Sequence, residues 1–573
     1  MPDITPTGES TAKSKTPRAI ADRYVAALAE LDPLLATRLG IGQGEDRLPD
    51  LTPAGHEAVD ALDRSALIDL ADGQPADDDD RRCARLLRER LEARLAMSAH
   101  GEQLRQISNL FGPPQRVRSI FLDMPAKTSD DWAVIASRMS KVPQALTEYR
   151  ASLAAGLSQG LIAGPKVVST VIGQLGDWAA ADGGKGWFAQ FAAGAAGAGV
   201  PDSLRAALDD AARSAAQAVA RLTGWLRTDY LPRAATQPDG VGEERYKVSA
   251  RLFTGANLDL AEAYSWGWSQ YLELRKQMRQ EAERIVPGAS AREAMDYLNA
   301  NGEAVEGVDA IRAKLQQMMD DAIADLDGTH FDIAAPVRTV EARIAPEGSA
   351  AAPYYTAPSN DFSRPGRTCL PTLGRTRFPL WNLVSTWYHE GVPGHHLQMA
   401  QWRYLSGQLS VYQTSVGMTS ACGEGWALYA ERLMDELGYL TGPGHRLSYL
   451  DAQMARAIRV VIDIGMHTAQ TIPAGSPVGA GQTWTPELAR EFFGMHSGRP
   501  AAFLDSEIIR YLSAPGQAIS YKLGERGWLA GRDAARAAHA ARGEEFDLKA
   551  WHMAALSLGS LGLDDLTDEL AKL

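Results

Sequence analysis

The sequence predicts a mainly α-helical protein with one short β-rich segment. Apolar residues recur at helical spacing through most of the 573 residues, and Ala-rich stretches such as 203–226 favour helices. Alternating apolar residues bounded by Pro and Gly are confined to residues 337–373. A chain of this length can bury a large core as one domain or as two lobes. We therefore expect two helical lobes around a central cleft, with a small β-sheet directly before the helix that begins near residue 381.

The composition excludes several classes of protein. Hydrophobic residues make up 45% and charged residues 23%, as in ordinary globular proteins. A net charge of −13 disfavours a groove for nucleic acid and a surface for anionic membranes. No apolar run is long enough to span a bilayer, and the polar N-terminus lacks a secretion signal. The three cysteines lie far apart, so no disulfide framework is expected. We predict a soluble cytoplasmic protein without nucleic-acid or membrane partners.

The chain divides into three predicted parts. Residues 1–17 are polar and predict a disordered tail, residues 18–235 an N-terminal helical lobe, and residues 236–573 a second lobe that carries the chemistry. Residues 232–242 are rich in Pro, Gly and polar side chains and indicate the connection between the lobes. Three helix starts are marked by residues typical of N-caps and first turns, namely Thr52-Pro53, Ser290 with Glu293, and Thr485-Pro486-Glu487.

A histidine-rich motif occupies residues 387–398, Trp-Tyr-His-Glu-Gly-Val-Pro-Gly-His-His-Leu-Gln. Zinc prefers neutral imidazoles and a carboxylate, and a hydrolytic site leaves one position open for water. In the usual zinc-peptidase pattern the two histidines lie four residues apart on one helix, with a glutamate beside the first as general base. His389 and Glu390 fit the first half of that pattern. The second histidine follows six residues later, at His395, or seven, at His396.

The longer spacing needs a structural explanation. On an unbroken helix His389 and His395 would lie about 120° apart and could not share an ion. Pro393 lacks an N–H, and Gly394 allows backbone angles that other residues avoid. We interpret residues 391–394 as a bulge that returns His395 to the metal-facing side. The spacing leaves open whether His395 or His396 is the ligand. The alternative is a helix kinked at Pro-Gly with partly buried histidines.

The predicted third ligand is Glu424, near the start of an amphipathic helix at residues 420–431. Metallopeptidases with two histidines on one helix commonly take a glutamate from a later helix. Glu431 lies on the same face two turns later, about 10 Å away, so both glutamates cannot bind one ion. The simplest interpretation of Glu431 is a solvated charge on the helix surface.

A third group of polar residues lies on an otherwise apolar helix at residues 455–467. Arg459, Asp463 and His467 recur every four residues and therefore share one face. One interpretation is a structural ion pair within a helical core. The other is functional: Asp463 orients His467, as a catalytic group, towards the substrate or a tetrahedral intermediate, and Arg456 or Arg459 holds a peptide carboxylate.

Two tyrosines are candidates for donating a hydrogen bond to an oxyanion. Tyr511 follows Glu507 and Arg510, and Tyr521 lies shortly after. A Tyr hydroxyl can stabilise the negative charge that develops opposite the metal. Arg510 could hold this segment through Glu507, and we expect Arg510 and Tyr521 to bind the substrate. Either tyrosine could instead be a residue of the core.

These motifs together resemble a large bacterial family known only as a domain of unknown function, with the signature His-Glu-x-x-Pro-Gly-His-His-Leu-Gln. Further matches lie in residues 361–366, 424–431, 463–467 and 515–522, and the resemblance covers most of the chain from about residue 240. Proteins of this family look like helical zinc-dependent peptidases. The insertion at residues 471–481 looks like an addition to the family pattern.

A wider similarity is to angiotensin-converting enzyme and thermostable bacterial carboxypeptidases, and it implies a zincin-like fold. Carried over residue by residue, it implies His389 as ligand, Glu390 as base, Glu424 as third ligand and Tyr511 as oxyanion donor. This chain departs from the pattern by the two extra residues between the histidines. Dipeptidyl peptidases have a similar pattern with one extra residue between the two histidines, so the pattern tolerates such a lengthening.

The sequence thus predicts a zinc-dependent hydrolase, with Zn²⁺ as cofactor and short peptides or peptide-like amides as substrates. A rival interpretation is a zincin-like scaffold that binds a peptide or metabolite without turnover. A third is a hydrolase or lyase of a specialised amide metabolite. The choice between exo- and endo-cleavage, the preferred side chains, the natural substrate and the oligomeric state stay open.

Overall fold

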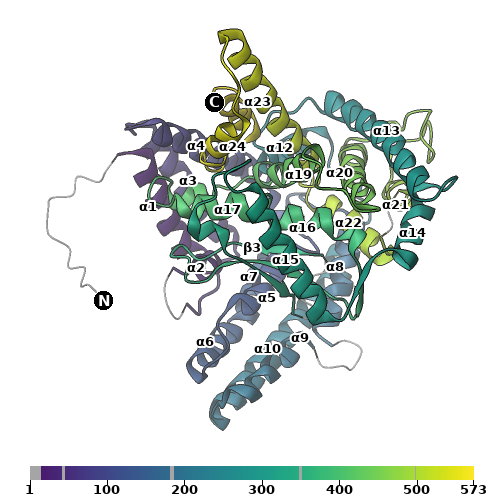
Figure 1. Cartoon of the computed structure of the whole chain (residues 1–573). Helices are drawn as coiled ribbons and strands as arrows, with labels where there is room; N and C mark the ends of the chain where they lie inside the picture. Colours follow the sequence, from purple (N-terminus) through teal and green to yellow (C-terminus); the bar gives the residue numbers. More distant parts are fainter. Residues whose placement is uncertain (1–14, 42–44, 181–185, 347–351, 497–498) are drawn as a thin grey trace.

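The structure is a computed structural model that describes residues 15–41, 45–180, 186–346, 352–496 and 499–573 (Figure 1). It is mainly helical with two small sheets, so the predicted mainly α fold class is confirmed. Of the predicted tail at residues 1–17, residues 1–14 lie outside the described residues, and helix α1 begins at Pro17. Among the described residues, no helix is both long and apolar enough to cross a membrane. The division into two lobes and the cytoplasmic location stay predictions.

The helices before residue 236 form the lower and left parts of Figure 1, where α6 and α10 extend downward. They are α1 (Pro17–Leu31), α2 (Pro33–Leu39), α3 (Pro53–Ala71), α4 (Asp78–Ala99), η1 (Glu102–Arg105), α5 (Pro113–Asp123), α6 (Ser129–Ser140), α7 (Val142–Ser158), α8 (Pro165–Trp178), α9 (Trp187–Ala193), η2 (Gly194–Ala198), α10 (Asp202–Trp225), η3 (Leu226–Tyr230) and α11 (Leu231–Ala234). Of the predicted connection at residues 232–242, residues 232–234 belong to α11, and residues 235–242 lie outside any helix.

The helices after residue 236 form the rest of the molecule, with α16, α17 and α19 in the middle of the view (Figure 1). They are α12 (Glu243–Thr254), α13 (Leu260–Ile285), α14 (Ala291–Asn301), α15 (Val308–Leu326), η4 (Ala335–Arg338), η5 (Leu380–Asn382), α16 (Val384–Glu390), α17 (His395–Tyr404), α18 (Val411–Thr414), α19 (Ser420–Glu436), α20 (His445–Thr468), α21 (Pro486–Met495), α22 (Ala501–Ser513), α23 (Ser520–Arg542), α24 (Leu548–Leu556) and α25 (Leu563–Leu570).

The predicted helix starts are confirmed by their hydrogen bonds. The hydroxyl of Thr52 accepts a bond from the N–H of Gly55, with Pro53 in the first turn. Ser290 and Glu293 form a reciprocal capping box at the start of α14. The hydroxyl of Thr485 accepts a bond from the N–H of Leu488 at the start of α21. Each cap supplies an acceptor to an N–H that the helix itself leaves unpaired, which is why these short patterns could be read from the sequence.

The predicted sheet lies just before α16. Strand β4 (Gly366–Leu370) is its centre, parallel to β2 (Val340–Ile344) and antiparallel to β3 (Tyr354–Thr356), which forms an edge. A second pairing was not expected: β1 (Ala304–Glu306) runs antiparallel to β5 (Arg377–Pro379). Each of these two strands has only three residues, too few for a period-two pattern to be visible.

Close packing fixes α19 in the centre of the molecule. Helix α19 lies against α23, and a Cβ on Gly425 would overlap the backbone of Gly524 on the facing helix. Small residues at such a crossing let two backbones approach closely. Trp426, Leu428 and Tyr429 are completely buried beside this contact. The crossing therefore holds Glu424, one residue earlier, in a fixed position.

Candidate metal centre

Two helices, and not one bulged helix, carry the histidines. Helix α16 ends at Glu390 and α17 begins at His395, with a cis peptide bond between Val392 and Pro393 in the connection. The predicted bulge within a continuous helix was therefore wrong in form. A Cβ on Gly394 would overlap the carbonyl oxygen of His389, so the connection needs glycine there for close approach. The break lets the two histidines face each other although their spacing does not match a helical period.

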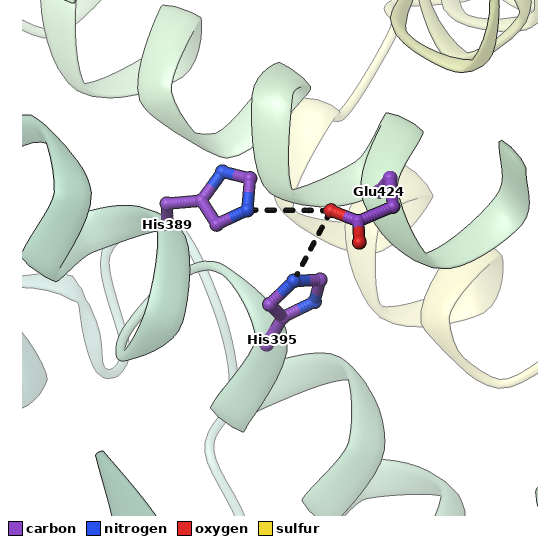
Figure 2. A group of neighbouring side chains, drawn as sticks. All are labelled: His389, His395 and Glu424. Carbon is purple, nitrogen blue, oxygen red and sulfur yellow. Dashed lines mark ion pairs between the residues drawn. The ribbon is translucent and has the colours of Figure 1, made fainter. Parts of the chain in front are cut away.

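His389, His395 and Glu424 meet at one point (Figure 2). The Nε2 atoms of His389 and His395 lie 3.4 and 3.5 Å from the same oxygen, Oε2 of Glu424. Ligand atoms about 2.0–2.2 Å from a zinc ion in tetrahedral geometry are about 3.3–3.5 Å apart. The group could therefore hold a metal ion, since its three ligand atoms all lie within 4.8 Å of one another.

His396 points away from this group. It is completely buried, its Nε2 lies 2.7 Å from the carbonyl oxygen of Val337, and its Nδ1 lies 3.0 Å from the hydroxyl of Tyr355. Burial lowers its pKa to about 4, although the bond to Val337 opposes this, so the ring is neutral at pH 7. A neutral ring can donate to Val337 and accept from Tyr355. His396 thus attaches α17 to β3 and to the end of η4, and the structure brings His395 to the group of candidate ligands.

Glu431 is the residue that sequence reasoning assigned wrongly. It is buried, with a 1% exposed side chain, and is not a solvated charge. Its Oε1 lies 2.8 Å from Nδ1 of His389, and its Oε2 accepts a hydrogen bond from Ser385. A carboxylate on the far nitrogen of a ligating histidine fixes the ring and its tautomer. The signal was the seven-residue spacing from Glu424, which puts both carboxylates on one face of α19.

The carboxylates around His389 make the site attractive to positive charge. Burial alone would lower the pKa of His389, but bonds to Glu424 and Glu431 raise it to about 9. Burial alone would raise the pKa of Glu424, yet its bonds to His389 and His395 hold it well below the ordinary value. The donor set therefore favours a cation between these side chains. This agrees with a metal site, because a bound ion would replace the proton.

His389, His395 and Glu424 line a cavity with a volume of about 720 Å³, and Glu390 lies on the wall of this cavity. Its side chain is 9% exposed, and burial raises its pKa, against the effect of His389 and His395. A buried carboxylate next to a metal site is a good proton acceptor when its pKa rises towards neutrality. Glu390 thus lies beside the candidate ligands, and its role as general base stays a prediction.

Three more predicted site residues line this cavity, namely Arg456, Arg459 and Tyr521. The guanidinium of Arg459 lies over the ring of Tyr521, 4.9 Å from its centre. Burial raises the pKa of Tyr521, and the charge of Glu424 raises it further. Gln517, which the sequence did not single out, also lines the cavity.

Tyr511 and Arg510 are not among the described residues that line this cavity. Tyr511 is completely buried, donates its hydroxyl proton to Glu507 at 2.8 Å and accepts a bond from Arg459 at 2.9 Å. Arg510 forms two bonds with Glu507, at 2.8 and 2.7 Å, and a third with Gln517. The expected pairing of Arg510 with Glu507 is thus present. These residues support Arg459 and Gln517, which do reach the cavity.

His467 and Asp463 also lie outside the cavity wall as described. Nε2 of His467 lies 3.1 Å from the carbonyl oxygen of Tyr511, and its Nδ1 accepts from the N–H of Val241. Asp463 accepts bonds from Tyr246 and Gly516, and lies 3.8 Å from His467. These contacts join α20 to α12 and to the end of α22. They suit the structural interpretation, and the catalytic role of His467 stays a prediction.

Comparisons with known proteins agree with the fold. A family model described as "Bacterial protein of unknown function (DUF885)" matches residues 33–570. A solved structure titled "putative lipoprotein", from Colwellia psychrerythraea, is 20% identical with a TM-score of 0.81, over 98% of this chain and 99% of that one. A second, of unknown function from Shewanella oneidensis, is 17% identical with a TM-score of 0.72, over 97% and 99%. No curated protein matches the chain.

Proposed function

The chain belongs to this bacterial family of unknown function, DUF885, and we propose that it is a zinc-dependent, zincin-like hydrolase of peptide bonds in short peptides or peptide-like amides. One observation carries the proposal: His389, His395 and Glu424 converge at ligand spacing on a cavity whose wall also includes Glu390. Three protein ligands with a carboxylate beside them are the arrangement of hydrolytic zinc sites.

Each residue of the site has its own role in the proposed reaction. A bound zinc ion would polarise the scissile carbonyl and acidify a water molecule. Glu390 would accept a proton from the attacking water and return it to the leaving amine, and its raised pKa suits both transfers. Glu431 holds His389 by Nδ1 and so keeps Nε2 turned into the cavity. Arg456 and Arg459 provide positive charge for a substrate carboxylate.

Tyr521 is better placed than Tyr511 to donate a hydrogen bond to the developing oxyanion. Tyr521 lines the cavity and interacts with the charge of Glu424, whereas the hydroxyl proton of Tyr511 is already donated to Glu507. Giving up that bond would leave the buried carboxylate of Glu507 with one donor fewer, which costs free energy. We therefore assign the oxyanion role in this proposal to Tyr521 and a supporting role to Tyr511.

The test is to load the protein with zinc and to digest a peptide library, with the products read by mass spectrometry. The wild-type protein should cleave a subset of peptides, and Glu390→Gln should keep zinc and fold but lose turnover by at least about 10²-fold. A matched control is Glu487→Gln, an exposed glutamate outside the cavity, which should cleave normally. Equal turnover in Glu390→Gln would remove Glu390 from the mechanism. A wild-type protein that binds peptides without cleaving any would support the rival, a binding scaffold.

A further inference from the structure

A second cavity lies beside the metal cavity and shares part of its wall. Its volume is about 760 Å³. Both cavities are lined by Arg94, Phe111, Leu252, Phe253 and Val416. Four of these five side chains are apolar, so they form an apolar border between the two spaces. The two cavities therefore adjoin each other at this border.

The arginines on the wall of the second cavity already have acidic partners. Among the described residues each of the four forms an ion pair, Arg94 with Asp63, Arg105 and Arg245 with Glu102, and Arg116 with Asp32. Arg105 and Arg245 share the one carboxylate of Glu102, so the charges of the four arginines are compensated in part. An anionic ligand would have to compete with these pairs.

Two carboxylates on the wall of the second cavity, those of Asp60 and Asp239, differ from the arginines in their partners. Asp60 accepts a hydrogen bond from Ser98, and Asp239 accepts one from the N–H of Lys166 at 3.1 Å. Neither has a basic side chain within 4.0 Å in the part of the chain that the structure describes. Burial raises the pKa of Asp239, although the N–H and the charge of Lys166 oppose this. Asp60 and Asp239 are thus the two carboxylates of this wall that can pair with a cationic group of a ligand without breaking an ion pair.

We propose that the second cavity binds the amino-terminal part of an oligopeptide substrate, with Asp60 and Asp239 facing its positive charge. This inference rests on the proposed function, because it extends the substrate from the metal. Arg456 and Arg459 line the metal cavity, where Arg459 is paired with Glu507 and Arg456 lies 3.9 Å from Glu431, so a peptide carboxylate there would also compete with existing pairs. The direction of the substrate in this proposal therefore depends on the second cavity.

The inference also assigns a role to the N-terminal helices. Asp60 lies on α3 and Arg94 on α4, whereas Asp239 lies in the connection between α11 and α12. These parts of the chain carry none of the candidate metal ligands. In the proposed arrangement they determine which peptides reach the metal, and α16, α17 and α19 carry out the hydrolysis.

The experiment measures binding without turnover. Two peptides, Lys-Ala-Ala-Phe-Ala-Ala with a free amino terminus and N-acetylated Gln-Ala-Ala-Phe-Ala-Ala, are titrated calorimetrically into zinc-loaded Glu390→Gln. The cationic peptide should bind about tenfold or more tightly, as one charge-assisted contact would give. Adding Asp60→Asn and Asp239→Asn should remove most of that difference and leave the acetylated peptide unaffected. Asn keeps an acceptor for Ser98 and Lys166, so the fold should survive.

Asp209→Asn, an exposed change on α10, is the matched control and should bind both peptides as the parent does. Equal affinity for the two peptides, or a preference that persists in the Asp60 and Asp239 double variant, would overturn the inference. Cleavage of short peptides by the wild-type protein would still stand in that case. Conversely, a preference that the double variant loses, in a protein that cleaves nothing, would retain the second cavity and reject the proposed hydrolysis. Val416→Trp narrows the border that the two cavities share. It should lower the affinity for Lys-Ala-Ala-Phe-Ala-Ala more than the affinity for the dipeptide Phe-Ala.

Discussion

Oε1 of Glu431 lies 2.8 Å from Nδ1 of His389, on the side of the imidazole that faces away from Glu424. The two glutamates are seven residues apart on α19 and so contact opposite nitrogens of one ring. One helix face therefore supplies both a candidate ligand and the group that orients another ligand. This relationship explains why a rigid α19, packed through Gly425 against α23, matters for the metal centre.

Removal of a ligand should abolish metal binding. His389→Ala and Glu424→Ala each delete one of three converging donors, so zinc content measured by plasma mass spectrometry should fall from about one equivalent to near zero. His395→Ala should behave in the same way. His396→Gln should keep its zinc, because His396 contacts Val337 and Tyr355 instead. Normal zinc in His395→Ala together with loss in His396→Gln would reverse the ligand assignment.

Glu431→Gln should weaken the metal site without emptying it. The amide is isosteric but loses the charge that holds His389, and such changes typically cost about 10–100-fold in metal affinity. The measurement is competition with a chromophoric zinc chelator. Ser385→Ala, which removes only the bond to the other oxygen of Glu431, is the control and should have a smaller effect. An affinity unchanged in Glu431→Gln would show that Glu431 has no part in the centre.

Tyr521→Phe should mainly lower kcat, whereas Tyr511→Phe should mainly lower the stability of the fold. Loss of an oxyanion donor typically lowers kcat by about 10²–10³-fold with little change in KM, and we expect this of Tyr521→Phe. Tyr511→Phe takes one buried hydrogen bond from Glu507 and one from Arg459, although these two residues stay paired with each other. It should lower the free energy of unfolding by about 1–3 kcal/mol, as measured by urea denaturation. If kcat falls only in Tyr511→Phe, the role first expected for Tyr511 from the resemblance is restored.

Asp463 should make stability depend on pH. Burial raises its pKa to about 7 in the folded protein, from an ordinary value of 3.8. Between these values the folded state holds a proton that the unfolded chain has released. The contribution is therefore fully present below about pH 4 and is lost as pH rises through 7. At about 1.4 kcal/mol per pKa unit, the loss is on the order of 3 kcal/mol from pH 4.5 to 8.

Asp463→Asn should remove this dependence. The amide oxygen can still accept from Tyr246 and Gly516, which both bond to one oxygen of Asp463. The free energy of unfolding of the variant, relative to that of the wild-type protein, should therefore increase between pH 4.5 and pH 8. Asp209→Asn, on the surface, controls for the loss of one acidic group. A constant difference between variant and wild type at both pH values would contradict the buried, proton-binding state of Asp463.

Local patterns in the sequence determined much of the fold and the identity of the candidate ligands. Helix caps at Thr52, Ser290 and Thr485 depend on residues within one turn, so they could be predicted without tertiary contacts. The mainly helical class followed from apolar periodicity in the same way. His389 and Glu424 were recognisable because metal chemistry restricts which residue types can serve as ligands.

Only the tertiary structure decided how these residues meet. The choice of His395 over His396 depends on Val337 and Tyr355, which lie more than 40 residues away in the chain. Likewise, Tyr511 and Tyr521 look equivalent in sequence, but the hydroxyl of Tyr511 bonds to Glu507 and Arg459, whereas Tyr521 lines the cavity. Such assignments depend on contacts between distant segments, and the spacing of residues along one helix carries no information about them.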